Sequence, residues 1–373
     1  MRFLHTSDLH IGKKLHGFDL EEDLRHAFDE IAQLAVREQA DAVVISGDIY
    51  DRADPSASAV RQFDEFLNRI LDTGCEAFLI YGNHDSPQRI SFGSKAFERS
   101  GIHVAKVYDG SIEPVTLQDE YGPVNFWMLP YLRAAEAEDA LRDLRDRIDG
   151  SERNVLLSHQ FVTGARIGDS EEMNVGALDN ISAELMNGFD YAALGHIHVP
   201  QDVKGKGAGT AKIRYSGSPV AYSFSEAESG DKTVTLVDLK EKGVVETKEI
   251  ALAPLHRMTT VRRCFDEILE DTAFAEEHAD DYVRAILLDE HEIADAMSRL
   301  RSLFPNIMHM EYDFMRSRTY DGEIESRIEG KSQEELFAEL YETQHGGTKM
   351  SEVQEQILRD LIREIWEGGH ETD

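Results

Sequence analysis

Five short polar signatures occur along this chain, and each directly follows an apolar run that predicts a buried strand. In order they are Asp8-Leu9-His10, Gly47-Asp48-Ile49-Tyr50-Asp51, Gly82-Asn83-His84-Asp85, Ser158-His159 and Gly195-His196-Ile197-His198. Because α/β proteins bind ligands at the carboxyl ends of their strands, we expect these side chains to meet at one site. They offer oxygen and imidazole ligands for two divalent metals, and two adjacent metals are suited to attack on phosphate esters.

The first 250 residues alternate apolar runs with helical patterns. Strands are expected at residues 2–7, 42–46, 77–81, 124–129, 154–158 and 191–194, and helices at residues 21–39 and 57–71. This alternation predicts an α/β layered fold. Beyond His198 we expect antiparallel strands at residues 213–216, 233–239 and 244–250, with a hairpin turn over residues 238–243. The glycine-rich residues 204–210 look like a phosphate loop, but a strand pattern follows where such a loop needs a helix, so we interpret them as a hairpin tip.

Pro254 marks a candidate domain boundary. Beyond it, strands at residues 258–263, 283–288 and 308–314 and helices at residues 266–274 and 293–303 predict a small α+β unit. A polar stretch over residues 316–331 precedes two helices, for which Ser332-Gln-Glu-Glu335 and Ser351-Glu-Val-Gln354 fit capping boxes. Both helices carry wide apolar stripes. Either the stripes pack on the body of the protein or they bind another protein, and we favour the second interpretation.

The formal net charge is −33, although a protein that binds nucleic acid usually has a basic surface. Much of the acidity looks peripheral, since residues 266–281 hold eight acidic side chains and no Lys or Arg. Lys13, Lys14 and His16 reverse the balance beside the first signature, and the local field steers a substrate more than the net charge does. The simplest interpretation is that the charge keeps the protein soluble. A high-salt habitat or a basic partner would also account for it.

Cys75 and Cys264 lie far apart and form no CxxC motif, which suits a reducing compartment. The first residues run straight into a strand and a ligand signature, and no stretch approaches 18 apolar residues. We therefore expect a cytoplasmic protein with no membrane segment.

The residue types in the signatures match metal chemistry. Asp8 and His10 are two apart at a strand end, so both can face one metal. Asp48 has two oxygens that can bridge two metals, and Gly47 permits a close backbone approach. Taken singly, each of these residues is also typical of a helix cap, a turn or a structural position. The complete ordered set is what argues for a metal site.

The later signatures add amide and imidazole groups. Asn83 offers a neutral oxygen ligand, whereas His84 is expected to face the substrate as hydrogen-bond donor or general acid, with Asp85 fixing its tautomer. His159 follows one strand, and His196 and His198 share one face after another. Mixed nitrogen and oxygen ligands suit Mn²⁺, Fe²⁺, Zn²⁺ or Mg²⁺, but the several imidazoles argue against Mg²⁺ alone, and we expect Mn²⁺.

These signatures, in this order, resemble those of the calcineurin-like metallophosphoesterase superfamily. Residues 2–12, the Gly195–His198 block, Tyr215-Ser-Gly-Ser-Pro219, Ser223-Phe224 and Arg316-Ser-Arg318 further resemble the bacterial SbcD family of nuclease subunits. The resemblance covers nearly the whole chain. It implies an α/β two-sheet sandwich flanked by helices, with a small α+β capping domain and C-terminal helices. The corresponding domains are residues 1–254 (metallophosphoesterase nuclease), 255–320 (cap) and 321–373 (linker and partner-binding helices).

The resemblance also implies roles for individual residues. Asp8, His10, Asp48 and His198 would hold one metal, and Asp48, Asn83, His159 and His196 the second, with His84 contacting the scissile phosphate. Archaeal and eukaryotic relatives often carry a histidine three residues after the bridging aspartate, where this chain has Asp51. What that histidine does for them is therefore in doubt here.

The implied activity is that of a Mn²⁺-dependent DNA exonuclease and endonuclease acting on duplex ends and hairpins in DNA repair and recombination. The implied partner is an SbcC-like coiled-coil ATPase, bound through the C-terminal helices, and relatives act as homodimers. One alternative is a phosphomonoesterase or cyclic-nucleotide phosphodiesterase with the same metal core, although such an enzyme needs no long segment after Pro254. Another is a DNA-end-holding scaffold with a relic site, against which the complete ligand set argues.

Overall fold

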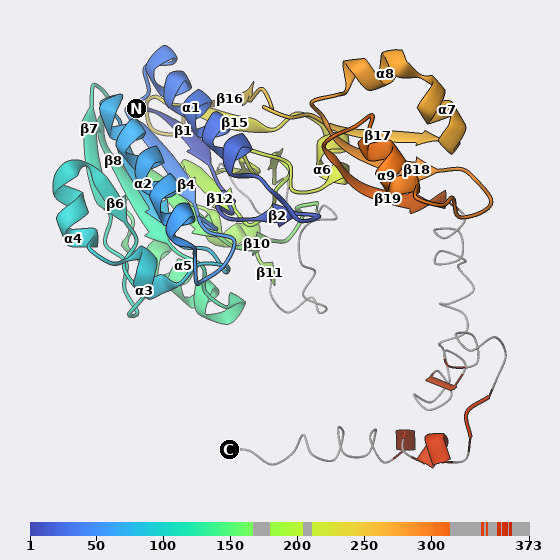
Figure 1. Cartoon of the computed structure of the whole chain (residues 1–373). Helices are drawn as coiled ribbons and strands as arrows, with labels where there is room; N and C mark the ends of the chain where they lie inside the picture. The colour runs from blue at the N-terminus through green and yellow to red at the C-terminus, as the bar shows by residue number, and fades with distance from the viewer. Residues whose placement is uncertain are drawn as a thin grey trace. The chain divides into compact units, whose positions relative to one another are not determined.

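Two six-stranded sheets form the larger of two compact units, which spans residues 1–286 and 293–310. The computed structural model describes residues 1–166, 180–203 and 211–313, and then residues 337–338, 341, 349–351, 353–356 and 358–359. The smaller unit comprises residues 287–292 and 311–373. Figure 1 shows helices on the outer faces of the two sheets.

The first sheet carries three of the five signatures. Its strands, in spatial order, are β16 (Val245–Ala251), β15 (Thr233–Leu239), β1 (Arg2–Thr6), β4 (Ala42–Ser46), β5 (Glu76–Ile80) and β6 (Ile102–Val104). Strands β1, β4, β5 and β6 are parallel, and β15 and β16 continue the sheet in antiparallel fashion. Helices α1 (Glu21–Arg37) and α2 (Ala57–Asp72) connect the first parallel strands, so the carboxyl ends of β1, β4 and β5 share one edge.

The second sheet carries the last two signatures. Its strands are β13 (Gln201–Asp202), β14 (Lys212–Tyr215), β12 (Tyr191–Gly195), β9 (Arg153–His159), β8 (Gly122–Leu129) and β7 (Val115–Asp119). Strands β8, β9, β12 and β14 are parallel, and helix α5 (Ala134–Arg147) shares a hydrophobic core with the outer face. The carboxyl ends of β9 and β12 therefore also lie at a common edge.

Alternation along the strands builds one core between the sheets and one on each outer side. Phe3 points into the inter-sheet core, where its ring lies 5.8 Å from that of Phe126, whereas Leu4 joins the core under α1 and α2. Phe28 of α1 stacks on Phe66 of α2 with ring centres 4.1 Å apart. Strands buried on both faces appear in the sequence as continuous apolar runs, which is why they were predictable.

The remaining elements are short. They are β2 (Lys14–Leu15), β3 (Phe18–Asp19), α3 (Pro87–Ile90), α4 (Ser94–Phe97), η1 (Glu98–Ser100), β10 (Phe161–Val162), β11 (Asn180–Ile181), η2 (Ala183–Met186), α6 (Phe224–Ser229), α7 (Phe265–Glu270), α8 (Thr272–Glu277) and α9 (Ala296–Arg301). A three-stranded sheet of β17 (Met258–Arg263), β18 (Tyr282–Leu287) and β19 (Ile307–Tyr312) follows Pro254.

The α/β two-sheet fold is confirmed, and so are the predicted strands and the hairpin between β15 and β16. The prediction of antiparallel strands after His198 holds for β15 and β16, whereas β14 lies in the second sheet, parallel to β12 and antiparallel to β13. The predicted helix over residues 266–274 is also divided, because Asp271 caps α8 by accepting a hydrogen bond from the backbone N–H of Phe274 at 3.0 Å.

Several predictions fall wholly or partly on residues outside the described part of the chain. The glycine-rich residues 204–210, the polar stretch over residues 316–331 and the capping box at Ser332 lie outside the described residues. The capping box at Ser351 is confirmed, because its N–H donates to Oε1 of Gln354 at 2.9 Å and its Oγ accepts from the N–H of Gln354 at 3.4 Å. Phe337 and Val353 are 47% and 69% exposed, and most of both apolar stripes lies outside the described part.

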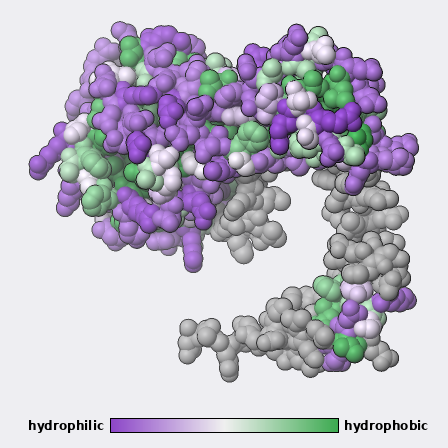
Figure 2. Space-filling model, in the orientation of Figure 1, coloured by the Kyte–Doolittle hydropathy of each residue, from purple (hydrophilic) through white to green (hydrophobic). Residues whose placement is uncertain are grey.

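The surface of the larger part of the chain is mainly polar. Figure 2 shows hydrophilic residues over most of the visible face of the coloured part that precedes residue 314. None of the described helices is long and apolar enough to cross a bilayer.

A buried ion pair within the second sheet also contacts the amino group of Met1, which precedes β1 of the first sheet, and it leads to a prediction on stability. Arg153 is 2% exposed and its Nη1 lies 2.9 Å from Oδ2 of Asp119, which also contacts the amino group of Met1. Burial alone would raise the pKa of Asp119, but hydrogen bonds from Arg153 and the terminal amino group hold it well below its usual range. We expect Asp119→Asn to lower the free energy of unfolding by about 3 kcal/mol at pH 7, because a buried guanidinium loses its counter-charge.

The sign of the pH dependence follows from the depressed pKa. The stabilisation by Asp119 is present above the unfolded-state pKa of about 4 and is lost as the pH falls toward the folded-state value. Urea unfolding at pH 7 and pH 3 should therefore show a difference between wild type and Asp119→Asn that shrinks in acid. Asp238→Asn is the control, because its partner Arg2 is partly exposed and an exposed pair contributes less than about 1 kcal/mol. Equal losses in the two variants would contradict the prediction.

Candidate metal centre

The five signatures lie at the carboxyl ends of five strands from both sheets. Asp8 and His10 follow β1, Asp48 follows β4, and Asn83 follows β5, whereas His159 ends β9 and His196 follows β12. Strands β1, β4 and β5 belong to one sheet and β9 and β12 to the other. The facing sheets therefore supply opposite halves of one site.

All seven candidate metal ligands lie together, in two groups on either side of Asp48. Its Oδ2 lies 3.6 Å from Nε2 of His10 and 3.3 Å from Nε2 of His159. On the first side, Asp8, His10 and His198 place possible ligand atoms within 4.8 Å of one another, and Asp48, His159 and His196 do so on the second. The side-chain oxygen of Asn83 lies 3.1 Å from Nε2 of His159 and 3.0 Å from Nδ1 of His196.

The backbone bends sharply to aim these side chains. Among the described residues, seven that are not glycine have positive φ, and four of them are Asp8, His10, Asp48 and His196. Residues with a side chain rarely adopt this backbone conformation. It costs energy and is concentrated at functional sites. Hydrogen bonds between the signatures support it: the N–H groups of Asp8 and His10 donate to the carbonyl oxygens of Gly47 and Asp48, each at 3.0 Å.

Two glycines allow the sheets to approach closely at the centre. A Cβ at Gly195 would overlap the carbonyl oxygen of Ser46, and a Cβ at Gly47 would overlap the ring of His159. Gly47 also has φ of 88°, where a side chain would be strained. The expectation that Gly47 permits a close approach is confirmed, and the group that approaches it is an imidazole that points at Asp48.

Hydrogen bonds fix which ring nitrogens face the centre. Nδ1 of His159 donates to the carbonyl oxygen of Ser46 at 2.8 Å, so Nε2 is the ring nitrogen that faces Asp48. Nδ1 of His198 lies 2.9 Å from Oε1 of Glu226, so its Nε2 faces Nε2 of His10 at 3.1 Å. Two ring nitrogens at this distance need a proton or a cation between them, because their lone pairs would otherwise repel each other.

The electrostatics also fit a cation. Burial alone would raise the pKa of Asp48, but His159, His10 and His84 hold it well below its usual value. Burial alone would lower the pKa of His159, but the carboxylates of Asp48 and Asp8 raise it to about 9. The two carboxylates stabilise a positive charge, which a protonated His159 carries here. A bound divalent ion would supply that charge instead. The donor set of two carboxylates, one amide oxygen and several imidazoles therefore fits borderline divalent metals.

Asp85 does not have the role expected of it. Its Oδ1 accepts from the N–H of Tyr50 at 2.9 Å, and its Oδ2 accepts from the N–H groups of Ile49 and Gly82 at 3.0 and 2.9 Å. The partner of His84 is instead the carbonyl oxygen of Asp51, 2.9 Å from Nδ1. The prediction that Asp85 fixes the tautomer of His84 is wrong, because the bent loop after β4 exposes N–H groups that the carboxylate satisfies.

This arrangement makes Asp85 a support for the loop that carries Asp48. We expect Asp85→Ala to lower the free energy of unfolding by at least about 2 kcal/mol, because three N–H groups lose their acceptor. We also expect weaker binding of Mn²⁺, measured by calorimetry, since Asp48 is no longer held. Asp54→Ala is the control, because Asp54 is largely exposed and the ion pair that it forms within the described part of the chain is with the exposed Arg89. A loss no larger than that of the control would contradict the supporting role.

Sequence reasoning missed several residues that build the centre. Glu226 contacts His198, and the ring of Tyr222 packs 5.3 Å from that of His10 and 5.6 Å from that of His198. Ser7 donates to Oδ2 of Asp8 at 2.5 Å. Tyr222 and Glu226 flank the Ser223-Phe224 block, which was recognised only by resemblance, and no periodicity marks them.

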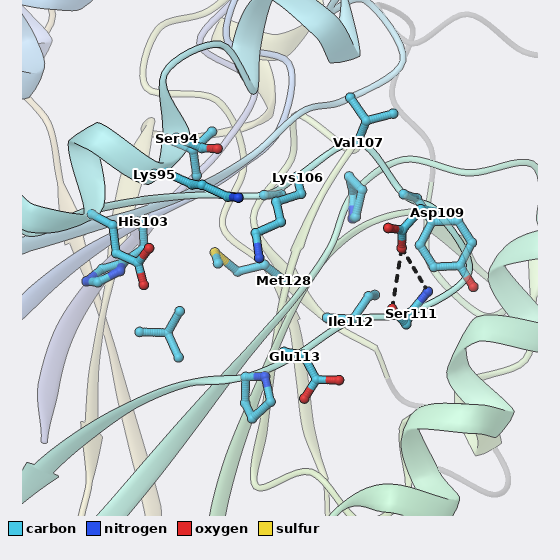
Figure 3. A pocket seen from close by; sticks show the side chains of 17 residues that line it. Ser94, Lys95, His103, Lys106, Val107, Asp109, Ser111, Ile112, Glu113 and Met128 are labelled. Carbon is cyan, nitrogen blue, oxygen red and sulfur yellow. Dashed lines mark hydrogen bonds between the residues drawn. The ribbon is translucent and has the colours of Figure 1, made fainter.

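A separate cavity of about 240 Å³ lies beside the edge strand β6. Figure 3 shows Lys95, Lys106 and Met128 extending into the same space, with Asp109 hydrogen-bonded to Ser111 nearby. No candidate metal ligand lines this cavity. The cavity is therefore separate from the candidate metal centre, where the possible ligands lie.

The geometry agrees with comparisons to known proteins. Residues 1–200 match the model of the calcineurin-like phosphoesterase family, and residues 254–345 match the one described as the type 5 capsule protein repressor C-terminal domain. Since the first match covers more than half of the chain, the chain belongs to the calcineurin-like phosphoesterase family. It is a hydrolase of the metallophosphoesterase kind, and it binds divalent metal ions.

Relatives narrow the assignment. Proteins named as the SbcD subunit of the nuclease SbcCD, from Staphylococcus epidermidis and Staphylococcus saprophyticus subsp. saprophyticus, are each 26% identical, over 97% and 98% of this chain and 98% and 99% of theirs. The resemblance to the SbcD family is therefore confirmed. Solved structures of a Thermus thermophilus protein and a Danio rerio dimetal phosphatase match with TM-scores of 0.41 and 0.44 and identities of 16% and 13%. They cover 66% and 68% of this chain and 98% and 99% of theirs.

Proposed function

We propose that this chain is a Mn²⁺-dependent DNA nuclease, with exonuclease activity on duplex ends and endonuclease activity at hairpins. It acts in DNA repair and recombination as the nuclease subunit of a complex with an SbcC-like coiled-coil ATPase. The main support is the pair of ligand groups that share Asp48. The match to relatives named as nuclease subunits, over nearly the whole chain, supports a nucleic-acid substrate, and DNA is the one proposed.

The proposal also assigns a role to each ligand, and the geometry supports it. Asp8, His10, Asp48 and His198 hold one ion, and Asp48, Asn83, His159 and His196 hold the other. Bound there, the ions supply activated water and neutralise charge on the phosphate oxygens. Asp48 is positioned to serve both, since its Oδ1 accepts from the N–H of His84 at 2.9 Å while its Oδ2 faces His10 and His159. Imidazole-rich coordination with no thiolate favours Mn²⁺ over Mg²⁺ alone.

His84 is the proposed proton donor to the leaving sugar oxygen. Its Nδ1 is held by the carbonyl oxygen of Asp51, which leaves Nε2 to hold or release a proton. The ring is half-buried and its centre lies 4.8 Å from that of His10, so it borders the ligands while remaining accessible. Asp51 takes part through its backbone carbonyl, and this role needs no particular side chain at that position.

The partner and domain assignments are part of the same proposal. Residues 1–254 form the nuclease domain, residues 255–320 the cap, and the helices within residues 321–373 bind the ATPase. The capping box at Ser351 supports a helix there, and the exposure of Phe337 and Val353 supports an apolar surface that a partner can cover.

Deleting residues 332–373 should abolish co-purification with the ATPase and spare basal hydrolysis. Retained co-purification would exclude these helices as the binding segment.

The activity itself is tested with labelled hairpin DNA and linear duplex DNA against a chromogenic phosphomonoester, each with Mn²⁺. We expect cleavage of both DNA substrates and little turnover of the monoester. Turnover of the monoester or of a cyclic nucleotide without DNA cleavage would instead identify a small-molecule phosphatase. DNA-end binding without cleavage by any divalent ion would identify a scaffold.

A further inference from the structure

A buried carboxylate stands behind one of the candidate metal ligands. Glu226, in the first turn of α6, is 3% exposed, and its Oε1 lies 2.9 Å from Nδ1 of His198. Its Oε2 accepts from the N–H of Tyr222 at 3.1 Å and lies 2.7 Å from Nζ of Lys232. The carboxylate is thus fully engaged, and it holds the ring of His198 in one orientation.

The local sequence explains why this glutamate turns inward. Oγ of Ser223 caps α6 by accepting the N–H of Glu226 at 3.1 Å, which anchors the backbone of the residue. Glu228, two positions later on the same helix, faces the other way and pairs with Arg284 at 2.8 Å. The two glutamates therefore share a helix but have different environments, which makes them a matched pair for experiment.

Lys232 connects the carboxylate to the backbone of the same ligand. Its Nζ donates to the carbonyl oxygen of His198 at 2.9 Å while pairing with Glu226, and its side chain is 10% exposed. The buried charge of Glu226 is therefore compensated. His198 is fixed at its ring by Glu226 and at its main chain by Lys232.

The other half of the centre has no equivalent among the described residues. The outer nitrogen of His159 faces the neutral carbonyl oxygen of Ser46. Within the first half, Nδ1 of His10 lies 3.8 Å from Oδ1 of Asp51, beyond hydrogen-bond distance, and that oxygen is 3.1 Å from Nζ of Lys13. A carboxylate hydrogen-bonded to a ligating histidine raises its basicity as a ligand, whereas a carbonyl does so less.

We propose that Glu226, compensated by Lys232, is a positioning residue that makes the two metal positions unequal. The position served by Asp8, His10 and His198 binds its ion more tightly than the position served by Asn83, His159 and His196. This inference rests on the ligand roles of the proposed function. It adds an order of filling: the first position is occupied at lower metal concentration than the second.

The test is a calorimetric titration of the full-length chain with Mn²⁺. Wild type should bind two ions with distinct affinities. Glu226→Gln should weaken the tighter class by about 10- to 100-fold, the usual cost of losing such a partner, and leave the weaker class within about threefold. Glu228→Gln should change neither class. Equal affinities in wild type, or a Glu226→Gln variant that loses nothing or loses both classes equally, would overturn the proposal.

Folding is checked by circular dichroism in the presence of a chelator. If Glu226→Gln does not fold, Glu226→Asp replaces it, since it keeps the charge opposite Lys232 but withdraws it from His198. It too should weaken only the tighter class, and an unchanged tighter class would overturn the proposal.

His198→Ala separates this inference from the proposed function. Loss of the tighter class in that variant, with none in Glu226→Gln, would refute only the inference. If His198→Ala keeps both classes, the ligand assignment itself fails.

Discussion

Replacing Asp48 by asparagine is expected to leave a folded protein that binds neither metal ion tightly and does not cleave DNA. Asp48 is 2% exposed, and its Oδ2 faces Nε2 of His10 on one side and Nε2 of His159 on the other. An amide of the same shape keeps one acceptor for the N–H of His84 but removes the charge that both groups of ligands share. No other candidate ligand faces both groups, so the loss should affect both ions.

The expected size is large. Metals contribute several kcal/mol of charge stabilisation in the transition state, and each 1.4 kcal/mol corresponds to a factor of ten, so cleavage should fall by about 10³-fold or more. Elemental analysis after dialysis against Mn²⁺ should show less than about half an ion per chain, compared with two for wild type. Asp54→Asn, at an exposed position, should match wild type in both measurements. A variant that keeps one ion would show that Asp48 serves a single position.

How much of this site the sequence predicts depends on how locally each part is encoded. Strand β4 has the predicted bounds, because residues 42–46 form an apolar run buried on both faces. The ligands at strand ends are predictable for the same reason, since the topology brings the carboxyl ends of parallel strands together. The pairing of β14 was not, because a short strand can add to either sheet, and only its contacts with β12 decide the matter.

The supporting residues are even less visible in the sequence. Asp85 satisfies N–H groups that become available only because Asp48 adopts a left-handed backbone, with φ of 49°. Glu226 reaches His198 across 28 positions of the chain, from a helix of six residues with no distinctive pattern. Such contacts depend on tertiary geometry, so residue type and spacing alone cannot assign them. The contact from Glu226 nevertheless decides which ring nitrogen of His198 faces the other candidate ligands.

The second large effect is expected at His84, and replacing this residue should change different quantities from those changed by replacing Asp48. We expect His84→Gln to keep nearly all bound Mn²⁺ while DNA cleavage falls by about 10²- to 10⁴-fold, the usual contribution of a general acid. The reason is that Nδ1 of His84 is engaged by the carbonyl oxygen of Asp51, so the residue presents one nitrogen and is not needed to complete either group of ligands. Elemental analysis and single-turnover cleavage of hairpin DNA measure the two quantities.

The choice of leaving group separates proton donation from metal binding. A phosphodiester with a nitrophenyl leaving group needs little protonation as its bond breaks, so His84→Gln should lose much less activity on it than on DNA. Asp48→Asn should lose activity on both substrates alike, because both require the metals. His84 does lie within ligand distance of His10 and Asp48, so direct coordination is the competing explanation. Under that explanation the two variants would lose metal equally and would be impaired equally on both substrates, and the assignment of His84 as proton donor would fail.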